Sequence, residues 1–304
     1  MELADLKTFE TVARHGSMNR AAAELNTVQS NVTARIRALE HELGVALFRR
    51  HARGVSTTPA GQRMLPLVGR VAKLMADVKM AARDDGEPAG SLELGALETT
   101  MALRLAPVLA GFARAHPQVR LAVHGGTSAA LIDDVLAGRL DGAFVAGPAD
   151  HPDLLAEPVF SEELVLVTSP AVASPQALAR RPDLRTIVFR SGCSYRQRLD
   201  TLLASLGIVA ARPLEFGSLD AILACVAADV GITLLPRAVA ALAADNGDVI
   251  LHPLAPGLAD VETLFVRRRD AYVSSALTVF LARARAAHAL PEKQKAPEGA
   301  LVVG

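Results

Sequence analysis

The chain has 304 residues, which is longer than one typical domain of roughly 100 to 200 residues and predicts two or three folding units. Apolar residues make up 51% of the sequence and charged residues 21%, a composition that is typical of packed globular domains and excludes wholesale disorder. The N-terminal residues include acids and an arginine where a signal peptide would be apolar, and no apolar run of about 18 residues follows. We therefore expect a cytoplasmic protein without a membrane partner.

The formal net charge is +0, but the charges are unevenly distributed along the chain. Residues 1–85 hold 13 Lys and Arg against 9 Asp and Glu, which leaves 19 against 23 in the remainder. The basic N-terminal part favours a nucleic-acid partner. The two cysteines, Cys193 and Cys225, form neither a disulfide framework nor a paired metal motif, so we expect no metal and no other cofactor.

Three segments within the first 45 residues have apolar residues at helical spacing. Gly16 ends the first segment in the manner of a C-terminal cap, and Ser17 can cap the second, which runs from residue 18 to 25. A third helix begins near Gln29, and its apolar stripe comprises Val32, Ile36, Leu39 and Leu43. Two short helices joined by a polar break are typical of a helix-turn-helix, whose second helix enters the DNA major groove. Any small three-helix core is the alternative.

Residues 46–58 contain two apolar anchors and a group of basic residues. Leu47 and Phe48 can hold the segment in place, and its polar part contains Arg49, Arg50, Arg53 and Gly54. This pattern favours a β-hairpin wing that lies over DNA phosphates, and a solvated charged loop is the alternative.

The next segment is predicted to form one long helix that ends near Arg83. Thr58 supplies an N-cap and Pro59 a first-turn proline. Apolar residues at heptad spacing follow, namely Met64, Leu67, Val71, Leu74 and Val78. One face of this helix therefore needs a partner helix, which predicts a dimer. Residues 84–90 are polar and rich in helix breakers, so they indicate a hinge between domains.

Beyond the hinge, strand-like runs alternate with amphipathic helices, an order that predicts an α/β fold with a largely parallel sheet. In a first series, strands are expected at residues 91–97, 119–124 and 140–146, with helices that end at His116 and Arg139. In a second series, strands are expected at 163–168, 186–190, 214–216 and 231–235, with helices at 194–206 and from Leu219. A strand at 261–266 and a helix near 272–288 can return the chain to the first of two lobes, and residues 291–304 are expected to be disordered.

The stretch FETVARHGSMNRAAAELNTVQSNVTARIRALEHELGVALFRR, with TTPAG after it, resembles the N-terminal domain of the LysR-type transcriptional regulators. The resemblance implies a winged helix-turn-helix at residues 1–58, a dimerising linker helix and hinge at 59–90, and a two-lobed effector domain at 91–290, like type 2 periplasmic binding proteins. Lobe I would comprise about 91–162 and 266–290, and lobe II about 163–265. The resemblance also implies a dimer of dimers on an interrupted inverted repeat, with a small-molecule inducer and RNA polymerase as further partners.

By this resemblance, the base-contacting positions of the family fall on Gln29, Ser30 and Thr33, and its wing contact on Arg53. Gln can pair bidentately with adenine, and Ser and Thr can serve several bases. An arginine on the wing suits the phosphate backbone or the minor groove, and Arg50 is expected to contribute there as well.

Two positions depart from the usual family pattern. Val28 stands where the family often has a serine cap, and Ala34 stands where it often has an arginine that contacts a base. We therefore expect Thr27, Asn31 and Arg37 to substitute for them.

In the family, the inducer binds in the cleft between the lobes, near strand ends and helix N-termini, as is usual for open α/β sheets. Hydroxyls and backbone N–H groups at a helix start, with arginines nearby, suit an anion, so a carboxylate ligand is our hypothesis. For Thr99, Ser191 and Ser194, an ordinary helix cap is the alternative. The expected effector-binding residues are Thr99, Thr100, Gly126, Thr127, Gly147, Arg190, Ser191, Cys193, Ser194, Tyr195, Arg196, Ser218 and Thr233.

Three rival functions deserve a comparison with the regulator. Cys193 at a helix N-terminus among arginines could make the protein a redox or electrophile sensor, whereas a free cysteine is more often a packing residue, as expected for Cys225. A solute-binding protein of a transporter would need an export signal, and the N-terminal residues do not form one. The 8 histidines lack HExxH spacing, and GxSxG and GxxxxGK motifs are absent, so we expect no enzyme.

Overall fold

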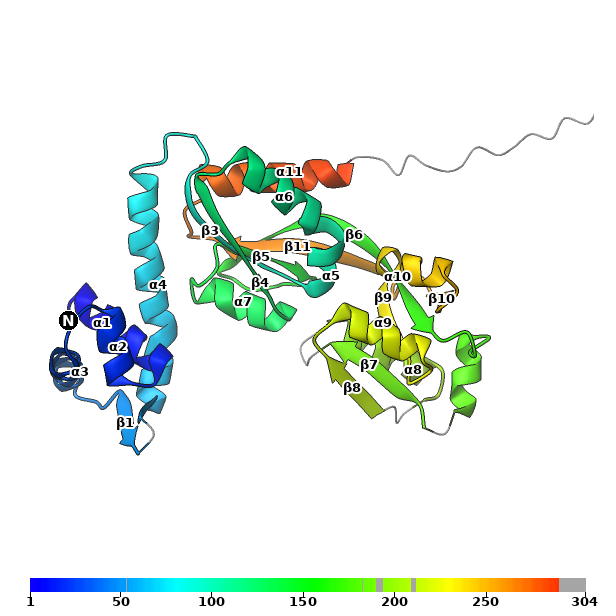
Figure 1. Ribbon diagram of the computed structural model, residues 1–304, viewed down its shortest axis with the longest axis horizontal. Coiled ribbons are helices and arrows are strands. Elements are labelled where there is room, and N and C mark those ends of the chain that lie inside the picture. The colour runs from blue at the N-terminus through cyan, green and yellow to red at the C-terminus, as the bar shows by residue number, and fades with distance from the viewer. Residues whose placement is uncertain (53, 182, 190–193, 209–211, 290–304) are drawn as a thin grey trace, which may run out of the picture.

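The computed structural model describes residues 1–52, 54–181, 183–189, 194–208 and 212–289. Figure 1 shows an N-terminal domain, a long helix beside it, and a larger α/β part made of two lobes. None of the helices in these described ranges is both long and apolar enough to span a membrane.

The N-terminal domain consists of three helices followed by a β-hairpin. Its elements are α1 (Leu3–His15), α2 (Met18–Glu24), α3 (Gln29–Leu43), β1 (Phe48–His51) and β2 (Gly54–Thr57). The expected caps are confirmed, because Gly16 ends α1 with φ 60° and the Ser17 hydroxyl accepts a hydrogen bond from the Arg20 amide. The core side chains include Phe9, Val12, Ala21, Val32, Ile36 and Leu39. The domain is a winged helix-turn-helix.

The hairpin is held against the turn between α1 and α2. The amide of Val55 donates a hydrogen bond of 2.9 Å to the carbonyl oxygen of Gly16. Gly54 has φ 134°, and a Cβ atom there would lie 2.3 Å from that same oxygen, so a larger residue does not fit. This close approach fixes the position of the wing relative to α2 and α3.

The long helix α4 (Pro59–Ala81) leaves the N-terminal domain and reaches the first lobe. The Thr58 hydroxyl caps it by accepting from the Gly61 amide over 3.1 Å, as expected. Val68 is buried in the core of the N-terminal domain, and Met64 packs beside it. Met64 therefore does not belong to the outward face to which its heptad spacing assigned it.

Lobe I is built on a mixed sheet with helices on both faces (Figure 1). Its strands are β3 (Gly90–Ala96), β4 (Val119–Gly125), β5 (Gly142–Ala146), the first part of β6 (Leu154–Thr168) and β11 (Asp260–Arg268). Its helices are α5 (Glu98–Thr100), the π-helix η1 (Met101–Leu105), α6 (Ala106–Ala115), α7 (Ser128–Leu136) and α11 (Ser275–Ala289). β3 runs parallel to β4 and β5, but β11 is antiparallel to both of its neighbours, so the sheet is not largely parallel as expected.

Lobe II continues from β6 and returns through β11. Its elements are the 3-10 helix η2 (Pro175–Arg180), β7 (Arg185–Phe189), α8 (Ser194–Ser205), β8 (Arg212–Phe216), α9 (Leu219–Ala227), β9 (Thr233–Pro236), α10 (Arg237–Asp245) and β10 (Ile250–Pro253). α10 and β10 were not expected from the sequence. Cys225 on α9 is half-buried rather than buried.

The crossing between the lobes differs from the expected boundaries. β6 is one strand of 15 residues, whereas only residues 163–168 were expected to be extended. Its first part pairs with β11 in lobe I, and its last part pairs with β9 and β10 in lobe II. Because β11 pairs with β6 from Asp260 onward, the chain returns to lobe I there and not at residue 266.

Candidate functional site

One side of α3 is turned away from the core of the N-terminal domain. Val32, Ile36 and Leu39 are buried, as the predicted stripe requires, but Leu43 at its end is 40% exposed and does not belong to it. The opposite side carries polar residues: Gln29, Ser30, Asn31 and Arg37 are exposed, and Thr33 is half-buried. The structure thus leaves accessible all five α3 residues that the sequence pointed to.

Two side-chain hydrogen bonds organise the start of α3. The Gln29 Nε2 donates to the Thr33 hydroxyl over 2.9 Å, and the Asn31 Nδ2 donates to the Thr27 hydroxyl over 3.1 Å. The N-cap is Val28, which provides no side-chain cap, so Thr27 does not take over that role as expected. An amide group has two N–H donors and a carbonyl oxygen, so each bond leaves Gln29 and Asn31 with further hydrogen-bonding capacity.

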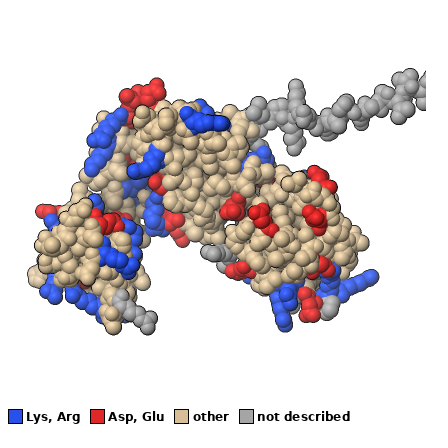
Figure 2. All heavy atoms as spheres, viewed as in Figure 1, with Lys and Arg blue, Asp and Glu red and all other residues tan. Residues whose placement is uncertain are grey.

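The wing presents arginines on both of its faces. Arg49 and Arg50 are exposed and follow one another in β1, so their side chains leave opposite faces of the hairpin. Arg53 lies outside the described residues. Within the described part of the chain, Arg49, Arg50 and Arg37 form no ion pair, whereas Arg14 and Arg35 are paired with Glu24 and Asp5. Figure 2 shows basic side chains on the outer surface of this domain.

Two basic residues near α2, Arg14 and His15, share the exposed carboxyl group of Glu24. Hydrogen bonds from Arg14, and then from His15, lower the pKa of the Glu24 carboxyl to about 2. The charge of Arg14 is therefore already compensated by a carboxylate of the domain itself. Arg37, Arg49 and Arg50, which form no ion pair within the described residues, remain available to an external anion.

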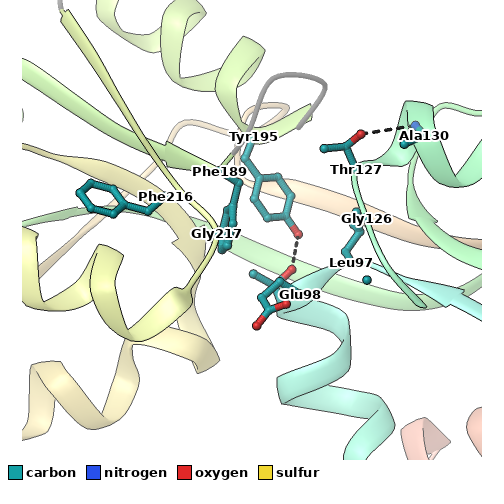
Figure 3. Close-up of a pocket in the computed structure, with 11 residues that line it drawn as sticks. Leu97, Glu98, Gly126, Thr127, Ala130, Phe189, Tyr195, Phe216 and Gly217 are labelled. Carbon is teal, nitrogen blue, oxygen red and sulfur yellow. Dashed lines mark hydrogen bonds between the residues drawn. The ribbon is translucent and has the colours of Figure 1, made fainter. Parts of the chain in front are cut away.

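A cavity of about 480 Å³ lies between the two lobes of the α/β part (Figure 3). Lobe I contributes Leu97, Glu98, Thr99, Gly125, Gly126, Thr127 and Ala130, and lobe II contributes Phe189, Tyr195, Phe216 and Gly217. The Tyr195 hydroxyl lies 3.4 Å from the Thr99 hydroxyl, so one hydrogen bond links the two walls. The cavity combines aromatic rings on one side with hydroxyls and a carboxylate on the other.

The polar wall of the cavity includes the start of a helix. The Thr127 hydroxyl caps α7 by accepting from the Ala130 amide over 3.3 Å, and both residues line the cavity. The positive end of the helix dipole is therefore directed at the cavity. Such a site can bind a small molecule that has an apolar body and a polar or charged group.

Comparisons with known proteins place both parts of the chain in one family. Residues 3–62 match the model described as bacterial regulatory helix-turn-helix protein, lysR family, and residues 85–289 match the LysR substrate binding domain. The chain belongs to the LysR family of transcriptional regulators. It is a DNA-binding regulator with an effector-binding domain, and its relatives are regulators and not enzymes.

Two relatives of this LysR-type regulator come from Bacillus subtilis strain 168. The uncharacterized HTH-type transcriptional regulator YusT is 40% identical over 281 residues, which is 92% of this chain and 94% of YusT. The HTH-type transcriptional regulator GltR is 39% identical over 288 residues, which is 94% of this chain and 96% of GltR. Similarity therefore extends over nearly the whole chain.

Solved structures agree with the arrangement of the domains. CbnR complexed with its target DNA is similar with a TM-score of 0.64 and 25% identity, over 94% of this chain and all 100% of CbnR. A full-length OxyR variant from Pseudomonas aeruginosa has a TM-score of 0.69 at 22% identity, over 96% of each chain, which shows the fold alone.

The cavity brings together only some of the residues that were expected to bind an effector. Thr99, Gly126, Thr127 and Tyr195 line it. The other described candidates do not. Thr100 and Thr233 are buried, a Cβ atom on Gly147 would lie 3.1 Å from Leu264, Ser218 is the N-cap residue of α9, and Arg196 is paired with Glu215 over 2.8 Å. Ser194 begins α8. Arg190, Ser191, Gly192 and Cys193 lie outside the described residues. The hypothesis that Cys193 is a thiol sensor therefore stays a prediction.

The sequence reasoning missed the aromatic wall of the cavity. Phe189 and Phe216 end β7 and β8, and they are directly paired in the parallel register of these strands. The rule that ligands bind at the carboxyl ends of parallel strands applies to both residues, but neither was among the expected effector-binding residues. Glu98 was missed although it directly precedes Thr99.

Proposed function

We propose that this LysR-type regulator binds an interrupted inverted-repeat operator as a dimer or a dimer of dimers, and that a small molecule in the cavity between the lobes controls it. The observation that carries the proposal is the apolar face of α4. Leu67, Leu74 and Val78 are 57%, 60% and 58% exposed, and Val71 lies between them at 37%. A second copy of α4 would cover this stripe and bring two recognition helices into a two-fold arrangement.

Selection from a random DNA library with the purified protein tests the operator. We expect enriched sequences to contain two inverted half-sites, with centres roughly 10 base pairs or a multiple apart, because a two-fold dimer places its α3 helices on one face of the duplex. Enrichment of single half-sites or direct repeats would contradict the proposed arrangement. We place RNA polymerase among the partners of the DNA-bound form.

The wing is proposed to lie over phosphates through Arg50 and Arg53. Replacing Arg50 by Ala should reduce the steepness of log K against log salt by about 0.9, because each lost phosphate contact releases one fewer condensed counterion. Arg49→Ala is the matched comparison, since Arg49 leaves the opposite face of the hairpin. Titrations of operator DNA at several salt concentrations measure both slopes. If neither slope changes, the wing is not part of the phosphate interface.

The effector is proposed to be a small carboxylate with an apolar or aromatic body. The start of α7 and the hydroxyls of Thr99 and Thr127 suit the carboxylate, and the rings of Phe189 and Tyr195 suit the body (Figure 3). A thermal-shift screen of aromatic carboxylates, each beside its uncharged amide, tests this chemistry. At a concentration of about 100 times Kd, a true ligand should raise Tm by roughly 5 to 10 °C.

Ala130→Leu should abolish that rise, because the added side chain enters the cavity at the start of α7. Ser218→Ala is the control, since Ser218 is not among the lining residues and its hydroxyl forms no capping hydrogen bond with α9. Equal rises for a carboxylate and its amide would contradict the proposed anionic group. Binding that survives Ala130→Leu unchanged would contradict the proposed location.

A further inference from the structure

The helix α4 has a third face, which packs against lobe I of the same chain. The Lys73 ammonium lies 2.6 Å from a carboxylate oxygen of Asp141 in lobe I and also pairs with Asp77 on α4 itself. Asp77 is only 5% exposed. Burial opposes the charge on Lys73, but the carboxylates of Asp141 and Asp77 outweigh it and raise the pKa of the lysine. A largely buried cluster of one lysine and two carboxyl groups thus joins the linker helix to the effector domain.

Two glycines allow the backbones to meet at this junction. A Cβ atom on Gly69 of α4 would lie 2.7 Å from the carbonyl oxygen of Ala137, in the turn that ends α7. The next residue of that turn, Gly138, has φ 74°, and a Cβ atom on it would lie 2.9 Å from the Cβ of Lys73. The atoms that a Cβ would meet are a backbone oxygen and the Cβ of Lys73, which cannot move aside as the end of a flexible side chain can. The two segments are therefore closely packed, and no larger residue fits at either glycine.

Further polar contacts hold the same surfaces together. Arg268 donates to the carbonyl oxygen of Leu136 over 3.1 Å and is paired with Asp270, which also lies 3.6 Å from Arg70 of α4. Beyond the end of α4, Asp84 accepts hydrogen bonds of 2.9 Å from the Tyr272 hydroxyl and the Ser275 amide. α4 is therefore fixed on lobe I at its middle, and the chain is fixed again just after it.

The helix α7 connects this junction to the cavity. Its N-cap residue Thr127 and its residue Ala130 line the cavity, and Ala137 and Gly138, directly after its last turn, lie against Gly69 and Lys73 of α4. Between these ends, Leu131 and Val135 are buried in the lobe core. Figure 1 shows α7 lying between α4 and lobe II. A helix of 9 residues is a rigid rod of about 14 Å, so a displacement at one end moves the other.

We infer that the last turn of α7 is a docking site for the linker helix of the same chain, and that α7 couples occupation of the cavity to the orientation of the DNA-binding domain. The coupling rests on the proposed effector site, whereas the docking does not. A ligand that moved the start of α7 by 1–2 Å, a shift typical of packed helices, would break or tighten the contact at Gly69. On α4, the junction residues Gly69, Lys73 and Asp77 lie beside the apolar stripe, and Leu67, Val71 and Leu74 line one hollow together with Lys73, Asp77 and Gly138.

Hydrogen exchange of the full-length protein, without any ligand, tests this inference. Gly69→Leu forces α4 away from the backbone of Ala137. Gly111→Leu is the matched control, because Gly111 is also inside a helix but its Cβ atom would meet nothing closer than 4.0 Å. Both substitutions improve helix propensity. In Gly69→Leu alone, amides of residues 136–141 and of residues 125–131 should exchange about tenfold faster.

Lys73→Met is a second test that leaves the glycine contact intact and removes the charge between Asp77 and Asp141. It should accelerate exchange in the same two segments, and it replaces Gly69→Leu should that variant not fold. Unchanged exchange at 136–141 would overturn the docking. Faster exchange at 136–141 with none at 125–131 would overturn the coupling. Because no ligand is used, either failure is distinguishable from a failure of the proposed effector site.

Discussion

Replacing Leu67 and Leu74 by Asp is expected to lower the affinity for a full inverted-repeat operator by about 100- to 10,000-fold and to leave half-site affinity nearly unchanged. Each residue is more than half exposed and lies on the apolar stripe of α4. Two carboxylates there would face their copies across the two-fold axis, where like charges repel and water is excluded. The operator affinity then falls, because the second half-site is no longer bound at high effective concentration.

Analytical ultracentrifugation and fluorescence anisotropy with full-site and half-site DNA measure these effects. Leu242→Asp is the control, because Leu242 on α10 is 73% exposed but lies outside the stripe. Thermal unfolding should change little in Leu242→Asp, since exposed substitutions seldom alter the free energy of unfolding by more than about 0.5 kcal/mol. The double variant should lose the part of its stability that depends on dimer formation and on protein concentration. A Leu67→Asp, Leu74→Asp protein that remains dimeric would show that α4 does not form the interface.

Replacing Gln29 and Thr33 by Ala is expected to cost about 1–3 kcal/mol of operator binding for each good base contact, with a much smaller loss on bulk DNA. The two side chains are joined by a hydrogen bond of 2.9 Å, so Thr33 holds the Gln29 amide in place along α3. Removing either one therefore disturbs the other. We expect the double variant to lose less than the sum of the single losses.

Anisotropy titrations with operator and random DNA at one salt concentration separate base recognition from phosphate binding. Leu43→Ala serves as the control, because Leu43 is exposed at the far end of α3. Equal losses on both DNAs would remove Gln29 and Thr33 from base readout. Strictly additive losses would show that their hydrogen bond plays no part on DNA.

The helices of the N-terminal domain and α4 could be predicted because their ends depend on local chemistry. Gly16, Ser17 and the pair Thr58-Pro59 act on neighbouring backbone groups, so helix ends follow from a few adjacent residues. The polar face of α3 likewise follows from a period of 3.6 residues. The resemblance of the N-terminal domain to a known family rests on the same local features.

The sequence predicted the polar residues of the cavity but not its phenylalanines. Polar residues after strands, such as Thr99 and Thr127, attract attention because a buried hydroxyl needs a partner. Phe189 and Phe216 do not, since an aromatic residue that faces a cavity and one that faces the core have the same character in a sequence. Which of them faces the cavity depends on how β7 and β8 pair and how the lobes meet.

The sequence alone determined the two-part organisation, the winged helix-turn-helix with its exposed α3 residues, and the apolar stripe of α4, because each depends on contacts between near neighbours. Only the tertiary structure decided the course of β6 through both lobes, since its partner β11 comes about a hundred residues later. It also decided that Gly69 and Gly138 meet and that α7 spans from the cavity to α4. The sequence shows that a glycine stands in a helix or a turn, but the atoms that leave no space for a Cβ at that position belong to a distant segment.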